Sequence, residues 1–141
     1  MTQKSFSEFE RAAMKERAQE LRAESNKKRN PAADLLEKIA ELPSDEAFIA
    51  SNLHKLVHEV APTLQPKTWY GMPAYADNTG QVVLFFQAAS KFKERYNTLG
   101  FNGVAALDSG KMWPTAYALT VWDDEVSHFI RKLIIKAISK N

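Results

Sequence analysis

The stretch Trp69-Tyr70-Gly71-Met72-Pro73-Ala74-Tyr75, followed after a turn by Val82-Val83-Leu84-Phe85-Phe86, contains the features that decide the fold. The second run is the longest uninterrupted apolar stretch with β-branched and aromatic side chains. A short run of this kind is typical of a strand that is buried on both faces. The first run combines aromatic residues with a glycine and a proline. It therefore predicts an aromatic edge that leads into the most buried strand of the protein.

Turn residues separate the predicted strands. The sequence Asp77-Asn78-Thr79-Gly80 is typical of a turn and joins the aromatic segment to the central strand as an antiparallel hairpin. Because Pro73 cannot donate a hydrogen bond to a neighbouring strand, we expect residues 70–76 to form an edge strand or an extended lead-in. The strands predicted after this segment span residues 81–88, 95–101 and 115–120.

Three further segments have helical periodicity. Prolines bound the first two, which we predict at residues 32–42 and 44–60, with Ser44 as the N-cap of the second. Thr120 or Asp123 is expected to cap the last helix, which has the clearest amphipathic pattern in the chain. The expected fold is therefore α+β, with an antiparallel sheet of about four or more strands backed by helices.

The N-terminal segment differs from the rest in charge. Ser5 and Ser7 each precede a glutamate by three residues, which predicts a helix start, and helix-forming residues continue to about Ser25. Residues 1–30 contain eight Lys and Arg against five Asp and Glu, whereas the remainder is close to neutral. We therefore predict a basic N-terminal helical extension over 1–30 and one α+β domain over 31–141. The extension is expected to be a solvated helix over the domain, or else a partner-binding, dimerising or phosphate-contacting arm.

Composition excludes several classes of site. The chain of 141 residues has no cysteine, which rules out disulfides, thiolate metal sites and cysteine nucleophiles. No apolar run approaches the roughly 20 residues that span a bilayer. The N-terminus has no hydrophobic signal region, so we expect a cytoplasmic protein that does not associate with membranes.

The chain offers few candidates for chemistry. His54 and His58 are four residues apart on a predicted helix, a spacing that metal ligands can have, but no third ligand is evident. We expect both to be exposed on the polar face of that helix, and His128 to face solvent. The acidic residues are explained by helix starts and turns, and no phosphate loop, nucleophile elbow or catalytic triad is present. An enzyme is therefore the least supported class, and we predict no catalytic residue and no metal site.

Aromatic residues are the strongest remaining feature. Buried Tyr and Trp side chains need partners for their polar atoms, and a cluster near strand ends can line an apolar pocket for a small ligand. Ordinary core packing is the alternative interpretation. The candidate ligand-binding residues are Trp69, Met72, Tyr75, Phe86, Arg95, Tyr96 and Trp113.

The same aromatic segment resembles the YdhG-like domain-of-unknown-function family. The likeness continues through residues 82–87, 91–92, 95–96, 98–101, 107–108, 110 and 112–114. Residues 13–17 are similar to a basic helical extension found in one subgroup. The resemblance implies an antiparallel sheet backed by helices, related in shape to the frataxin and YjbR-like folds. Some relatives are labelled frataxin-like iron chaperones, and most have no assigned activity.

These observations lead to three hypotheses. The first is a non-enzymatic binding module without a cofactor, which holds a small ligand or a protein partner at an aromatic-lined sheet edge. The second, implied only by the family resemblance, is an intracellular iron chaperone. Iron in such a setting prefers hard oxygen ligands, and the predicted helix at 44–60 offers only three acids, Asp45, Glu46 and Glu59. The third is nucleic-acid or partner binding through the basic N-terminal helix, although the charge excess is small for nucleic acid. A homodimer stays open.

Overall fold

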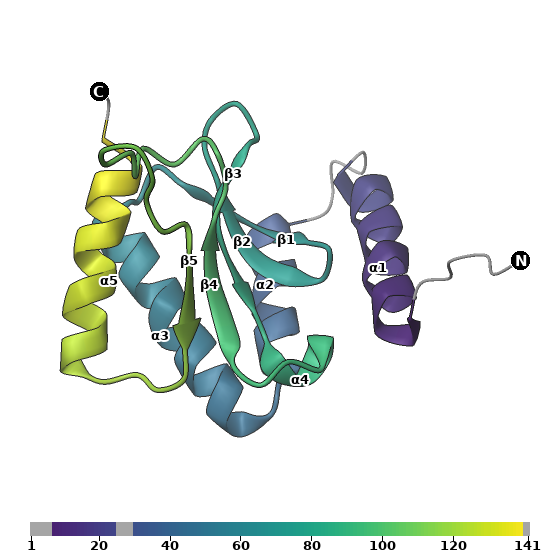
Figure 1. The fold of residues 1–141 in the computed structure, drawn as a ribbon. Coiled ribbons are helices and arrows are strands. Elements are labelled where there is room, and N and C mark those ends of the chain that lie inside the picture. Colours follow the sequence, from purple (N-terminus) through teal and green to yellow (C-terminus); the bar gives the residue numbers. More distant parts are fainter. Residues whose placement is uncertain (1–6, 25–29, 140–141) are drawn as a thin grey trace, which may run out of the picture.

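The computed structural model describes residues 7–24 and 30–139, and in this part of the chain it contains five helices and one five-stranded antiparallel sheet (Figure 1). The helices are α1 (Glu8–Glu24), α2 (Pro31–Ala40), α3 (Ser44–Val60), α4 (Ala89–Phe92) and α5 (Asp124–Ala137). The strands are β1 (Gln65–Trp69), β2 (Met72–Ala76), β3 (Val82–Gln87), β4 (Asn97–Phe101) and β5 (Ala116–Leu119). The predicted α+β fold with an antiparallel sheet and an N-terminal helix is confirmed.

The strands lie side by side in chain order, from β1 to β5. This order corrects the prediction that residues 70–76 form an edge strand or a lead-in, because β2 lies between β1 and β3. Pro73 is tolerated there because it pairs with Thr68 of β1, while pairing with β3 begins only at Ala74. The missing N–H of Pro73 therefore falls where β3 makes no ladder contact.

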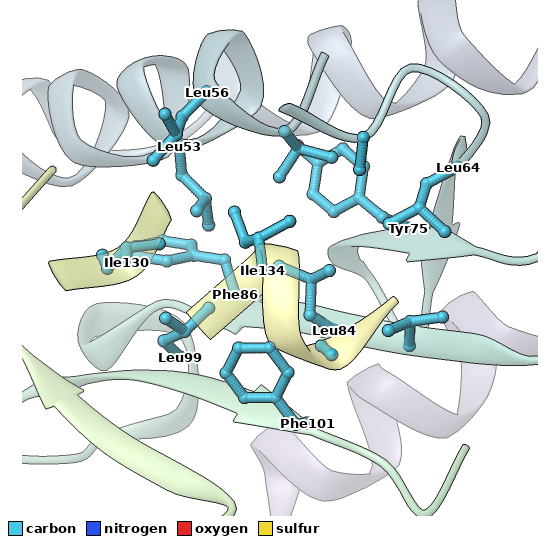
Figure 2. Close-up of a cluster of buried hydrophobic side chains, with 14 of the residues drawn as sticks. Leu53, Leu56, Leu64, Tyr75, Leu84, Phe86, Leu99, Phe101, Ile130 and Ile134 are labelled. Carbon is cyan, nitrogen blue, oxygen red and sulfur yellow. The ribbon is translucent and has the colours of Figure 1, made fainter. Parts of the chain in front are cut away.

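Helices α2, α3 and α5 cover one face of the sheet (Figure 1). Figure 2 shows the core between them, where Leu84 and Phe86 of β3 meet Leu53 of α3 and Ile134 of α5. The prediction of a buried central strand is confirmed, except that Phe85 is partly exposed on the opposite face. We call that opposite side of the sheet the outer face.

The helix ends have identifiable caps. Ser7 and Glu10 form the predicted capping box, with the Ser7 N–H donating to Glu10 Oε1 at 3.0 Å and the Glu10 N–H donating to Ser7 Oγ at 3.3 Å. Ser5 lies outside the described residues. Asp123 caps α5 by accepting from the Val126 N–H at 2.8 Å. The N-cap prediction for Ser44 is wrong, because Ser44 is the first helical residue of α3 and Pro43 occupies the cap position.

The predicted boundary between the extension and the domain falls between α1 and α2. Asn30 caps α2, accepting from the N–H groups of Ala32 and Ala33 at 3.1 and 3.3 Å. Helix α1 lies beyond β1, on the far side of the sheet from α5 (Figure 1). None of the described helices is both long enough and apolar enough to cross a membrane.

Candidate functional site

The structure separates the predicted ligand-binding residues. Tyr75 and Phe86 are fully buried in the core under the helices. Trp69 lies on the outer face, with its ring centroid 5.3 Å from that of Phe85. Met72 is buried at the start of β2. These aromatic residues therefore belong to opposite faces of the sheet.

The remaining predicted residues lie elsewhere. Arg95 is exposed and stacks its guanidinium over the Tyr96 ring at 5.0 Å. Trp113 is partly buried and packs against the edge of the core. Tyr96 directly precedes β4, whereas Trp113 lies in the loop before β5, and the structure does not bring the seven residues to one place.

A different set of apolar residues lines a groove between β5 and α5. The cavity volume is about 300 Å³, and its main lining residues are Leu99, Tyr117, Val121, Val126, Phe129 and Leu133. The Tyr117 ring lies edge-on to Phe129 at 5.8 Å and to Phe101 at 6.3 Å. Phe129 and Val121 are 54% and 55% exposed. We call this feature the β5–α5 groove.

Two polar residues border the β5–α5 groove, Thr120 and Glu125. Both follow β5 in the chain and precede or begin α5, so the loop between the two elements places them at the same end of the groove. The apolar walls and the polar border together resemble a small-molecule site, in which a few polar groups orient an otherwise apolar ligand.

A partly buried hydrogen bond connects α3 to the sheet. His54 Nδ1 lies 2.9 Å from the Tyr75 hydroxyl. The expectation that His54 is exposed is therefore wrong, because its ring is partly buried against β2, whereas His58 and His128 are exposed as expected. Burial lowers the pKa of His54, and the nearby His58 lowers that pKa further. Burial also raises the pKa of the Tyr75 hydroxyl.

The lowered pKa of His54 predicts acid sensitivity. In the unfolded chain His54 binds a proton below its usual pKa of 6.5, whereas the folded protein resists that proton. The stabilisation is therefore present above pH 6.5 and is lost as the pH falls through the folded value. We expect urea denaturation to give a lower free energy of unfolding at pH 5.5 than at pH 7.5, and a smaller difference in His54→Gln. The exposed His128→Gln is the control and keeps the wild-type difference; an unchanged difference in His54→Gln contradicts the assignment.

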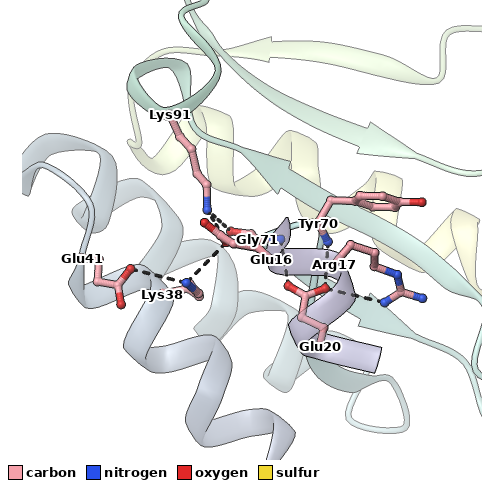
Figure 3. A network of polar contacts seen from close by, with 8 residues as sticks. All are labelled: Glu16, Arg17, Glu20, Lys38, Glu41, Tyr70, Gly71 and Lys91. Carbon is pink, nitrogen blue, oxygen red and sulfur yellow. Dashed lines mark hydrogen bonds and ion pairs between the residues drawn. The ribbon is translucent and has the colours of Figure 1, made fainter. Parts of the chain in front are cut away.

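The turn between β1 and β2 holds a carboxylate from α1 (Figure 3). Tyr70 and Gly71 are its central residues and have φ angles of 53° and 77°. Positive φ at both positions is typical of two-residue hairpin turns of type I′. The Tyr70 N–H donates to Glu20 Oε1 at 2.9 Å, and the Gly71 N–H donates to Glu20 Oε2 at 2.8 Å. One carboxylate thus accepts from two consecutive backbone donors, and Glu20 is only 9% exposed.

A second carboxylate of α1 lies one helical turn away. Glu16 Oε2 accepts from Lys91 Nζ at 2.7 Å and lies 3.4 Å from Lys38 Nζ. Lys91 also donates to the Gly71 carbonyl at 3.1 Å, which ties the two contacts together. We call the N–H groups of Tyr70 and Gly71, with the ammonium groups of Lys38 and Lys91, the carboxylate seat.

The docked face of α1 repeats at helical spacing and comprises Phe9, Ala13, Glu16, Arg17 and Glu20. The Arg17 guanidinium lies 5.5 Å from the centre of the Tyr70 ring, and Lys93 Nζ lies 5.8 Å from that of Phe9. These are cation–π distances. Charged groups therefore take part in the docking at both ends of this face of α1, with Lys93 on Phe9 at one end and Glu20 on the turn at the other.

Sequence reasoning did not find the carboxylate seat. Type I′ turns favour Asn-Gly, Asp-Gly and Gly-Gly, so of the pair Tyr70-Gly71 only the glycine pointed to this turn. The roles of Glu16 and Glu20 were not open to prediction, since glutamates recur along α1 and helical spacing alone does not identify which face docks.

Among residues 7–24 and 30–139, no group of three or more His, Asp or Glu is placed to hold a metal ion. Comparisons with protein-family models, with curated proteins and with solved structures find no match to this chain. The YdhG-like resemblance accordingly stays a prediction.

Proposed function

We propose that this protein is a non-enzymatic binding module that holds a small apolar molecule in the β5–α5 groove. The observation that carries the proposal is the gathering of exposed apolar side chains around this groove. Phe129 and Val121 keep more than half of their surface in contact with water, although both border a cavity with apolar walls. Covering such surface is favourable in proportion to the apolar area removed from water.

The size of the groove favours a small ligand. Its volume of about 300 Å³ is at the lower end of the range for sites that bind small molecules. Tyr117 supplies an aromatic wall that is held edge-on by Phe101 and Phe129. Glu125 and Thr120 offer an acceptor and a hydroxyl at the border. We therefore propose a mainly apolar ligand with one hydrogen-bonding end.

The proposal predicts saturable binding of the neutral dye Nile red. We expect about one binding site per chain, and at least a tenfold loss of affinity in Phe129→Lys, because a charge in the groove wall must be desolvated when the dye binds. Fluorescence titration measures this change. The control is Ile135→Lys, since Ile135 is 50% exposed on the same helix and does not line the groove. Equal affinity of the two variants, or a signal that does not saturate, overturns the proposal.

This proposal retains the hypothesis of a binding site at an edge of the sheet but assigns the site to a different edge. The edge proposed as the site is β5 with α5, in place of the segment around Trp69. A cytoplasmic location, the iron-chaperone hypothesis and nucleic-acid binding by the N-terminal helix stay predictions from the sequence. No contact of the described residues favours one of them over the groove.

A further inference from the structure

We propose that the carboxylate seat is a recognition site for an acidic helical segment of another protein, and that α1 masks this site in its own chain. The proposal is independent of the β5–α5 groove, which lies at the opposite edge of the sheet. It rests on how the seat is built, on the polar character of the contacts that hold α1 there, and on the donors that the seat keeps when α1 is absent.

The seat is built from preorganised donors. The backbone N–H groups of Tyr70 and Gly71 converge on one carboxylate because both residues have positive φ, so the turn itself and no flexible side chain positions them. Hydrogen bonds from consecutive backbone N–H groups are a recurring way to bind anions. When the acceptor is ionised, such bonds are shorter and stronger than neutral ones.

The seat also specifies a spacing. The turn binds the Glu20 carboxylate and Lys91 binds the Glu16 carboxylate, so the seat recognises two carboxylates four residues apart on one helix. Ala13, three residues before Glu16, is buried against the domain, which requires a small side chain there. The recognised element is therefore a helix with alanine, glutamate and glutamate at relative positions 1, 4 and 8.

Gly71 leaves room for the charged ends of two side chains beside the turn. A β-carbon at this position would overlap the Glu16 carboxylate and the Lys91 ammonium group. The absence of a side chain thus lets the ligand carboxylate, the lysine and the turn backbone meet at one point.

Polar and charged contacts make up much of the docking of α1 on the domain. Of its side chains that the structure describes, only Ala13 and Glu20 are buried, and Met14 and Leu21 are about half exposed. Most of the attraction is therefore electrostatic and is weakened by salt. Because α1 is on the same chain, it competes at an effective concentration on the order of millimolar, which a partner helix must exceed. Once α1 is displaced, Lys38 keeps its ion pair with Glu41 at 3.6 Å, whereas Lys91 and the N–H groups of Tyr70 and Gly71 lose the carboxylates that they bind, so the seat is complementary to an acidic partner.

The test uses the full-length chain with the two seat-binding glutamates of α1 replaced. In the double variant Glu16→Gln, Glu20→Gln, the domain is untouched but α1 loses the two negative charges that the carboxylate seat binds. The first probe is a fluorescent peptide of residues 7–24. The second is an alanine- and glutamine-rich helical peptide that carries only the alanine and the two glutamates at the same spacing. We expect fluorescence anisotropy to show that the double variant binds both peptides at least tenfold more tightly than the wild-type chain.

Two controls isolate the seat. Peptides with both glutamates replaced by glutamine are expected not to bind, and Lys91→Met added to the double variant is expected to weaken binding at least tenfold. Equal binding by the wild-type chain and the double variant overturns the masking, and binding of the glutamine peptides overturns carboxylate recognition. Binding of the first peptide alone restricts the seat to the chain's own helix and overturns a foreign partner. Analytical ultracentrifugation tests a further alternative. A wild-type dimer that dissociates in the double variant would assign the seat to a second copy of this chain, and would likewise overturn a foreign partner.

Discussion

Replacing Phe86 by alanine is expected to lower the free energy of unfolding by about 3–5 kcal/mol, the usual cost of removing a fully buried phenylalanine. Phe86 is 0% exposed and lies between β3 and the helices, among Leu53, Leu99 and Ile130 (Figure 2). Its removal leaves a cavity that rigid strands and helices on both sides close only in part. Chemical denaturation monitored by circular dichroism measures the loss.

The neighbouring residue of the same strand provides the control. Phe85 points to the outer face, where it packs on Trp69 and remains partly exposed. Phe85→Ala is therefore expected to cost about 1–2 kcal/mol, since only part of the burial free energy of the ring is lost. A loss in Phe85→Ala as large as that in Phe86→Ala would contradict the assignment of the two faces. It would also remove the reason for treating Phe86 as a core residue and not a ligand-binding one.

Replacing Gly71 by alanine is expected to weaken the docking of α1 on the domain. The added methyl group would occupy the space of the Glu16 carboxylate and the Lys91 ammonium group, so both side-chain ends would have to move and their ion pair would be disturbed, and the residue would be held at a φ of +77°. Isolated helices of this length are only marginally stable in water, so a displaced α1 should lose protection of its amides. We expect hydrogen–deuterium exchange in residues 13–22 to become at least tenfold faster, while exchange in β3 changes little.

Gly80 separates backbone strain from the loss of docking. It has a φ of +88°, and a β-carbon there would meet no atom within 4 Å. Gly80→Ala thus introduces a similar left-handed strain, on the order of 1–2 kcal/mol, without contact to α1. Exchange in residues 13–22 should match the wild type in this variant. If Gly71→Ala leaves the exchange of α1 unchanged, the close packing of the helix on the turn is not what holds it.

Local patterns in the sequence were sufficient to predict several elements. The apolar run at residues 82–86 became β3, and α3 has the predicted bounds, because each signal depends on neighbours along the chain. The Ser7–Glu10 capping box and the Asp123 cap were correct for the same reason. The hydrogen bonds of both caps join residues only three positions apart.

Features that depend on pairing were missed. The segment Gln65–Trp69 contains a proline and a lysine and has little strand character by itself, but it becomes β1 because β2 offers it a partner along its whole length. Once β1 is present, residues 70–76 cannot be at the edge. The predicted site failed for a related reason, since the register of the strands decides which aromatic side chains face the core. Tyr75 and Phe86 face the core, whereas Trp69 does not.

The chain-order sheet has a consequence for how the protein folds. Each strand pairs with the next one along the chain. The contact between α3 and α5, by contrast, joins a helix that precedes all five strands in the sequence to one that follows them. Closing a long loop costs more chain entropy than closing a short one, and proteins rich in local contacts fold faster. We therefore expect neighbouring strands to pair early in folding, and the packing of α5 on α3 to complete the interior late.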